Sequence, residues 1–190
     1  MDIESQIVAS IEVKQKILAD KALIAKIGEV AEVCVQAYKR GNRILLAGNG
    51  GSAADAQHIA AEFVNRFMFD RPGLPAIALT TDSSMLTAIA NDYGFEMLFE
   101  RQLEANGKRG DVFVGISTSG NSKNVLKAIR CCKDLGITSV GLVGEVGEIQ
   151  FLADYVIDVP SQSTPRIQES HIMIGHIICG IIENSLFKKQ

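Results

Sequence analysis

The sequence lacks the features that mark membrane, secreted and nucleic-acid-binding proteins. No apolar run approaches the ~18 residues of a membrane-spanning helix, and the first residues are acidic and amphipathic where a signal peptide would be basic and then apolar. A formal net charge of −3 provides no basic surface for nucleic acid or for an anionic membrane. We therefore expect a cytoplasmic protein that binds neither nucleic acid nor a membrane.

The sequence also lacks the cysteine spacings of redox and metal motifs. Its four cysteines include the adjacent pair Cys131 and Cys132, and no two of the four form a CxxC motif. Neighbouring cysteines rarely form a disulfide with each other. We expect this pair, Cys34 and Cys179 all to be reduced thiols. This pattern is typical of buried cysteines in a reducing compartment.

The chain begins with a long amphipathic segment. Residues 2–39 repeat apolar side chains at helical spacing, and Gly41-Asn42 then ends the pattern. We expect residues 1–40 to form an N-terminal helical arm that packs on a sister subunit, because an amphipathic stripe of this size needs a covering surface. At 190 residues, the chain is long enough to bury a core as one domain. We expect a single domain over residues 1–190, in which residues 41–190 form the α/β core.

Beyond the arm, short apolar segments alternate regularly with helical ones. The expected strands cover residues 43–47, 75–79, 111–116, 138–143 and 155–159, and the expected helices cover 52–67, 83–90, 95–106, 122–134 and 165–187. Continuous apolar strands separated by helices predict an α/β fold: a three-layer sandwich around a five-stranded parallel sheet covered on both faces. Ligands of such sheets bind beyond the carboxyl ends of the strands.

A glycine-rich loop, GNGGS at residues 48–52, follows the first expected strand. Glycines allow the backbone to approach an anion, and the next helix offers its free N–H groups. Together with Ala53 the loop also matches the dinucleotide pattern G-x-G-x-x-A, for which Asp82 would be the acidic partner. That alternative leaves the second loop of this kind unexplained, so we rank it last.

The second loop, STSGNS at residues 117–122, follows the third expected strand. Four of its six residues carry hydroxyls, which together with a helix N-terminus suit a phosphate monoester. Capping of the helix by Ser119 or Ser122 would account for one hydroxyl only. Asn121 stands where a nucleotide-hydrolysing P-loop has lysine, which argues against nucleotide hydrolysis.

Five segments occur together in the order of a known enzyme family: NGGSAADAQHIAAEFVNRF, RPGLPAIALT, AIANDYGFE, GDVFVGISTSGNSKNV and RIQESHIMIGHI. On these motifs the chain resembles the sugar isomerase (SIS) family and, within it, the bacterial phosphoheptose isomerases. The resemblance covers nearly the whole chain as a single SIS domain, and it implies that the parallel sheet is of the flavodoxin-like type. It implies conversion of sedoheptulose 7-phosphate to D-glycero-D-manno-heptose 7-phosphate, the first step of ADP- or GDP-heptose biosynthesis, by a homotetramer with one zinc ion per subunit. Lipopolysaccharide, capsule and S-layer glycan all remain possible destinations of the product.

The resemblance also assigns site residues. The implied zinc ligands are His58, Glu62, Gln168 and His176. The implied substrate contacts are Asn49, Gly50, Gly51, His58, Glu62, Asn91, Asp92, Ser117, Thr118, Ser119, Ser122 and Gln168. A non-catalytic, regulatory SIS protein is the alternative, and retention of all four ligand positions argues against it.

Residue chemistry agrees with part of this assignment. His58 and Glu62 are four residues apart and share a helix face above the glycine-rich loop, where they can bind a metal or transfer protons. Gln168 and His176 span ~12 Å of helix and can converge only on an ion between helices. On spacing alone His171 competes with His176, and we interpret His171 as part of a polar helix face or subunit contact.

Aldose–ketose isomerisation moves a proton between C1 and C2 through an enediol. It requires a base that serves both carbons and an acid near the two oxygens. Glu62 is the predicted base and His176 the predicted acid–base partner. A carboxylate bound to zinc is a poorer base, so either Glu62 alternates between the two roles or the metal is chiefly structural.

Overall fold

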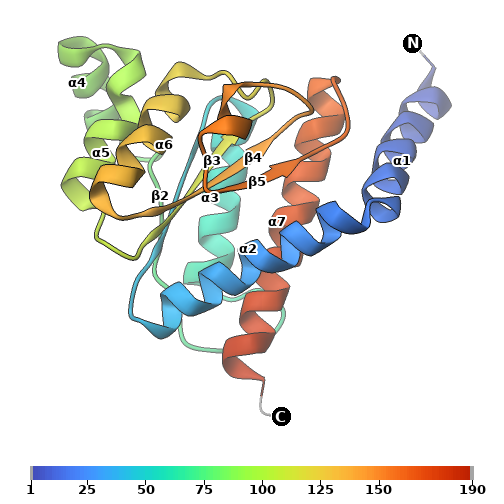
Figure 1. The fold of residues 1–190 in the computed structure, drawn as a ribbon, viewed down its shortest axis with the longest axis horizontal. Helices are drawn as coiled ribbons and strands as arrows, with labels where there is room; N and C mark the ends of the chain where they lie inside the picture. Colours follow the sequence, from blue (N-terminus) through green and yellow to red (C-terminus); the bar gives the residue numbers. More distant parts are fainter. Residues whose placement is uncertain (1, 189–190) are drawn as a thin grey trace.

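The computed structural model describes residues 2–188 and contains three layers (Figure 1). The strands are β1 (Ile44–Gly48), β2 (Ala76–Ala78), β3 (Val112–Ser117), β4 (Thr138–Val143) and β5 (Tyr155–Asp158). The α-helices are α1 (Ile3–Ala19), α2 (Lys21–Lys39), α3 (Gly51–Val64), α4 (Ser83–Tyr93), α5 (Leu98–Asn106), α6 (Lys123–Leu135) and α7 (Thr164–Phe187). Two short 3-10 helices, η1 (Phe95–Met97) and η2 (Glu148–Phe151), complete the described chain.

The five strands form one parallel sheet in the order β2-β1-β3-β4-β5. This is the flavodoxin-like order, so the predicted fold class is confirmed. The chain leaves β1 outward to β2 and then returns to β3 on the other side of β1. The loops after β1 and β3 therefore diverge at the topological switch point, where a crevice for ligands forms.

Both faces of the sheet are covered, which explains why the strands are apolar throughout. In β1, Ile44 and Leu46 belong to the core beneath α2, α3 and α7, whereas Leu45 and Ala47 belong to the core beneath α5 and α6. All four are buried to at least 99%. A strand buried on both faces has no alternation of polar and apolar residues.

The N-terminal arm is two helices and not the continuous one that its periodicity predicts. Asp20 ends α1 and caps α2, where its carboxylate accepts hydrogen bonds from the N–H groups of Ala22 and Leu23, each at 3.0 Å. An aspartate at the N-cap satisfies donors that a new helix leaves unpaired. α1 consequently turns away from α2 and extends from the body of the molecule (Figure 1).

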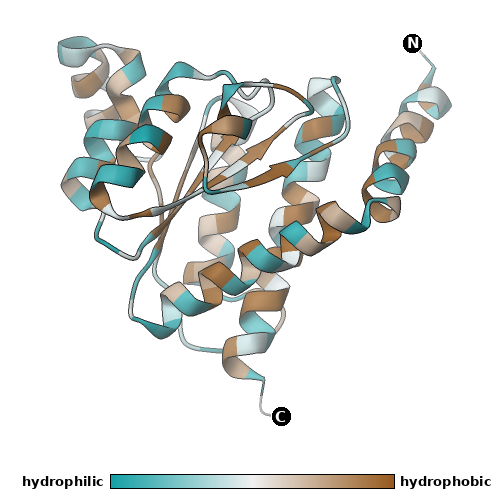
Figure 2. Cartoon of the chain, in the orientation of Figure 1, coloured by the Kyte–Doolittle hydropathy of each residue, from teal (hydrophilic) through white to brown (hydrophobic). Residues whose placement is uncertain are grey.

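The two arm helices also differ in burial. α2 buries Leu23, Ile27 and Val30 in the core, whereas α1 leaves Ile3 77% and Leu18 67% exposed. Figure 2 shows apolar residues distributed along α1 although this helix projects from the domain. The arm thus contains one core helix and one helix whose apolar side chains are largely uncovered in a single chain.

Other boundaries also differ from expectation. α3 ends at Val64 and not at residue 67, α4 continues to Tyr93 and not to residue 90, the expected helix 95–106 is divided into η1 and α5, and β2 has three residues and not five. Residues 65–75 form an irregular segment between α3 and β2. By length and composition alone, α7 is long and apolar enough to cross a membrane, and core helices of soluble proteins often share these two properties. It packs against α2 and α3 in the core.

Candidate active site

The two predicted anion loops meet at the switch point between β1 and β3. Asn49 follows β1 and Asn124 lies in the first turn of α6, and their side-chain amides form a reciprocal pair with both N–O distances 2.9 Å. Asn124 is 2% exposed, and its oxygen also accepts a hydrogen bond from the N–H of Val125. This pair connects the glycine-rich loop to the hydroxyl-rich one, a connection the sequence analysis missed.

The hydroxyls of the second loop are not used to cap the following helix. Ser122 occupies the N-cap position of α6, yet its side chain makes no capping hydrogen bond and instead lies 2.9 Å from the hydroxyl oxygen of Ser117. The Ser119 hydroxyl accepts a hydrogen bond from the N–H of Asn121 at 3.2 Å. Gly120 is required in this turn, because its φ is +65° and a Cβ would lie 2.6 Å from the carbonyl oxygen of Val146.

The glycine-rich loop brings Gln168 to the N-terminus of α3. Gly50 has a φ of +56° and precedes the first helical residue, Gly51. The Gln168 side chain packs directly on Gly51, where an added Cβ would overlap its amide group. The first turn of α3 is thereby covered by a polar amide from α7.

About two turns further along these helices, three potential metal ligands converge. The Nε2 atom of His58 lies 3.1 Å from a carboxylate oxygen of Glu62 and 3.1 Å from the Nε2 atom of His176. The potential ligand atoms of these three residues all lie within 4.8 Å of one another. Two imidazoles and a carboxylate with facing lone pairs form a donor set that suits Zn²⁺.

Of the two histidines of α7, the structure brings His176 to His58 and Glu62, whereas the His171 ring lies against the carbonyl oxygen of Val143. The Gln168 amide packs against Gly51, at the start of the helix that carries His58 and Glu62. The structure of one chain therefore brings His58, Glu62 and His176 together, and the fourth predicted ligand, Gln168, lies on the same pair of helices.

The predicted contacts on α4 are not brought to the loops in a single chain. Asn91 and Asp92 are exposed near the end of α4, where the Asn91 amide donates to the Asp92 carboxylate at 2.8 Å. The residues that follow do reach the site, since one surface depression is lined by Asn49, Gly94, Phe95, Glu96, Ser122, Lys123 and Asn124. Lys123 is a cation beside the hydroxyl-rich loop that the sequence analysis overlooked, although it directly follows the motif.

His171 is buried and not on a polar face or subunit contact, so that interpretation was wrong. Its ring is fully buried, with Nε2 3.1 Å from the carbonyl oxygen of Val143 at the end of β4. A carbonyl only accepts, so Nε2 carries the proton. Nδ1 has no hydrogen-bond partner in the part of the chain that the structure describes. Burial lowers the pKa of His171 to about 4, against a small opposing effect of the Val143 hydrogen bond.

We predict that His171 makes the protein acid-sensitive. Between pH 6.5 and 4 the unfolded chain binds a proton at this ring and the folded protein does not, so stability falls as the pH falls through that window. From pH 7 to pH 5 the loss from this group is about 2 kcal/mol. Urea unfolding of the wild-type protein and of His171→Leu at both pH values measures it. The leucine variant has no ring to titrate, so its free energy of unfolding should fall less, by that amount. The carbonyl of Val143 still accepts a hydrogen bond from the N–H of Val159 in this variant. Equal losses in the two proteins would contradict the prediction.

Comparison with known proteins places this site in a family. A family model for the SIS domain matches residues 9–144. A phosphoheptose isomerase from Aneurinibacillus thermoaerophilus is 62% identical over 189 residues, covering 99% of this chain and 96% of the relative. The chain belongs to the phosphoheptose isomerases of the SIS domain family.

Solved structures of this family agree with the fold. A phosphoheptose isomerase from Neisseria gonorrhoeae superposes with a TM-score of 0.89 at 43% identity, covering 96% of this chain and 97% of that one. A phosphoheptose isomerase from Francisella tularensis gives 0.91 at 37% identity, with 96% of both chains covered. The dinucleotide alternative would use Asp82 as its acidic partner. In the structure Asp82 instead caps α4, where its carboxylate accepts a hydrogen bond from the N–H of Met85 at 2.8 Å.

Proposed function

We propose that the protein is the isomerase that converts sedoheptulose 7-phosphate to D-glycero-D-manno-heptose 7-phosphate, supplying heptose for an ADP- or GDP-activated product. The main support is the convergence of His58, Glu62 and His176 beside the helix α3 that begins at the glycine-rich loop. The Asn49–Asn124 pair joins that loop to the hydroxyl-rich loop, so a phosphate group and a metal or proton-transfer centre can lie in one site.

The residues of the chain divide the work as follows. Ser119, Ser122 and the N-terminus of α6 bind the phosphate. Glu62 removes the proton from one substrate carbon and returns it to the other, while His176 moves protons among the oxygens. A zinc ion held by His58, Glu62 and His176, with Gln168 as a proposed fourth ligand, would polarise the carbonyl. Asn49, Gly50, Gly51, Asn91, Asp92, Ser117 and Thr118 are the remaining proposed substrate contacts.

The assignment is tested by offering three ligands to the purified protein. Sedoheptulose 7-phosphate should raise the thermal unfolding midpoint and be converted to an aldose phosphate, which mass spectrometry after borohydride–deuteride reduction detects. Fructose 6-phosphate should stabilise the protein less, and NAD should have no effect. Stabilisation by the heptulose phosphate without turnover would favour the non-catalytic alternative.

We further propose a cytoplasmic homotetramer in which the whole chain is one SIS domain with residues 1–40 as its arm. The exposed apolar residues of α1 support this, as does a groove lined by Leu18, Ile24, Ile177 and Ile181 between the arm and α7. Such a continuous apolar surface is typical of subunit interfaces.

Deletion of residues 1–19 tests the role of the arm. It removes α1 but keeps α2, whose side chains belong to the core, so the domain should still fold. We expect species of smaller mass or aggregates by light scattering, because the deletion removes the exposed apolar residues of α1 and one wall of the groove. Ile3→Ser, at an arm residue that is 77% exposed, is the single-site companion variant. An active truncation with the full assembly mass would refute the role.

A further inference from the structure

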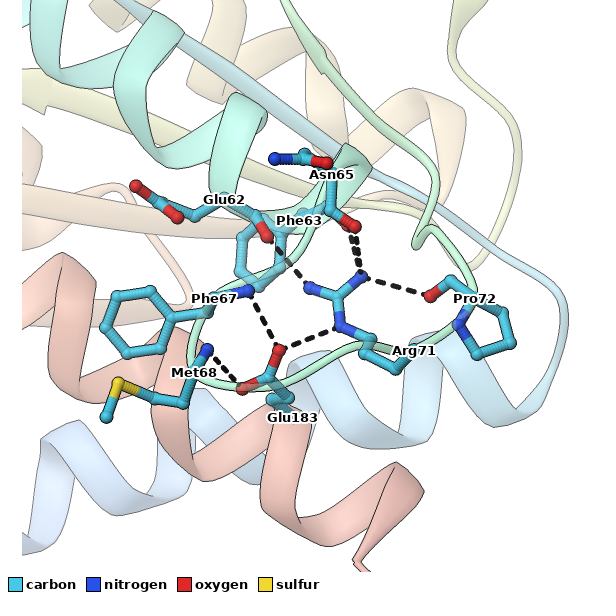
Figure 3. Close-up of polar contacts among 8 residues, drawn as sticks. All are labelled: Glu62, Phe63, Asn65, Phe67, Met68, Arg71, Pro72 and Glu183. Atoms are coloured by element: carbon cyan, nitrogen blue, oxygen red, sulfur yellow. Dashed lines mark hydrogen bonds and ion pairs between the residues drawn. The ribbon is translucent and has the colours of Figure 1, made fainter.

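A buried ion pair lies directly behind the histidine–carboxylate cluster. Arg71, in the segment after α3, pairs with Glu183 of α7 at an Nε–Oε1 distance of 3.0 Å. Figure 3 shows the pair and its neighbours. The two side chains are 2% and 1% exposed. Removing two charges from water is costly unless hydrogen bonds replace the lost hydration, so the other partners of this pair indicate what it does.

Arg71 holds the C-terminal end of α3. Its Nη2 donates to the carbonyl oxygen of Glu62 at 2.8 Å, and its Nη1 donates to that of Phe63 at 2.7 Å (Figure 3). These carbonyls belong to the last turn, which has no helical N–H partners and carries the negative end of the helix dipole. A planar guanidinium donates to both carbonyls and to Glu183 at once in a fixed fork, a geometry that the point charge of a lysine does not reproduce. The backbone that carries the Glu62 carboxylate is thereby fixed from behind.

Glu183 holds the segment that follows. Its two carboxylate oxygens accept hydrogen bonds from the N–H groups of Phe67 at 2.9 Å and of Met68 at 2.7 Å (Figure 3). The ring of Phe67 stacks on the imidazole of His176, with centroids 5.5 Å apart and planes inclined by 26°. Glu183 thus fixes the backbone of the residue whose ring supports His176.

The charge state of Glu183 is consistent with this arrangement. Burial alone would raise the pKa of its carboxyl, but the N–H donors of Met68 and Phe67 and the guanidinium of Arg71 outweigh burial and lower it. The carboxylate is therefore ionised near neutral pH and accepts from all three donors.

We propose that Arg71 and Glu183 are a positioning pair that fixes the Glu62 carboxylate and the His176 imidazole at the separation that metal binding and proton transfer require. The inference rests on the proposed function, because it concerns the same site. Neither residue makes a hydrogen bond to the clustered side chains: Arg71 acts through the backbone of Glu62, and Glu183 acts through Phe67. Groups that orient metal ligands from outside typically contribute 10–100-fold in affinity or activity.

The test measures zinc binding, which needs no sugar. Metal-free wild-type protein, Arg71→Lys and Glu183→Gln are titrated with Zn²⁺ against a chromogenic chelator, and Co²⁺ absorption spectra report the ligand geometry. Both variants should bind Zn²⁺ about 10–100-fold more weakly and show an altered Co²⁺ spectrum. In the assay with sedoheptulose 7-phosphate, kcat should fall while KM changes little, because the phosphate loops are untouched.

Asp111→Asn is the matched control. Asp111 is a fully buried carboxylate that accepts from Asn42 and from the N–H groups of Arg43 and Lys108, but at the amino edge of the sheet. This variant should lose stability and keep wild-type zinc affinity.

If the charge variants do not fold, Phe67→Leu replaces them, since it removes only the ring on His176. Wild-type zinc affinity and Co²⁺ spectra in the folded variants would overturn the inference, as would a wild-type protein that binds no zinc. A wild-type protein that binds zinc but does not isomerise the heptulose phosphate instead contradicts the proposed function.

Discussion

Glu62→Gln should abolish exchange of solvent hydrogen into the substrate carbon while sugar phosphate binding persists. Glutamine keeps the shape of the side chain but cannot accept the carbon-bound proton. General acid–base groups contribute ~10²–10⁴-fold in rate, so the loss should be plain in an initial-rate assay. Incubation with sedoheptulose 7-phosphate in heavy water, followed by mass spectrometry, measures deuterium incorporation directly.

His176→Gln is the companion variant. It should lower turnover without abolishing exchange or binding, because protons can also move between substrate oxygens through water. Both residues belong to the proposed metal site, so the zinc content of each variant must be measured alongside. If Glu62→Gln retains zinc and still exchanges label at the wild-type rate, Glu62 is only a ligand and His176 becomes the candidate base.

The sequence predicts most of this architecture because the relevant signals are local and periodic. A strand such as β1, buried on both faces, is apolar at every position, and the loops that follow β1 and β3 differ from ordinary turns in glycine and hydroxyl content. The His58–Glu62 pair follows from the helical repeat alone. Its third member, His176, came from family resemblance, since spacing along α7 did not distinguish it from His171.

Other features depend on tertiary contacts that no local pattern records. Arg71 lies in an irregular segment with charged neighbours, and a sequence pattern gives no reason to bury it. His171 lies one turn from Gln168, but its burial depends on the end of β4 lying opposite. The break at Asp20 is different, because an aspartate before a helical run is an N-cap signal that apolar periodicity across the junction concealed.

Replacing Ser119 and Ser122 together by alanine should raise the Michaelis constant for sedoheptulose 7-phosphate by ~10²-fold or more. Each hydrogen bond to a charged group contributes roughly 1.5–3 kcal/mol, and two are lost. The fold should persist, because Ser122 makes no capping hydrogen bond in α6 and Ser119 accepts only one bond, at 3.2 Å, within its own turn.

Inorganic phosphate provides a second measure of the same loop. Phosphate should inhibit competitively, and in the variant its inhibition constant should rise by the same factor as the Michaelis constant. The reason is that the phosphate group is the only part it shares with the sugar phosphate, and this is the group that the loop binds. Ser117, which is 3% exposed, loses its Ser122 partner in the variant. The free energy of unfolding measured in urea should therefore fall by about 1 kcal/mol. If the Michaelis constant and the phosphate inhibition constant both stay at wild-type values, the phosphate binds elsewhere. The cation of Lys123 beside the first turn of α6 would then be the next group to test.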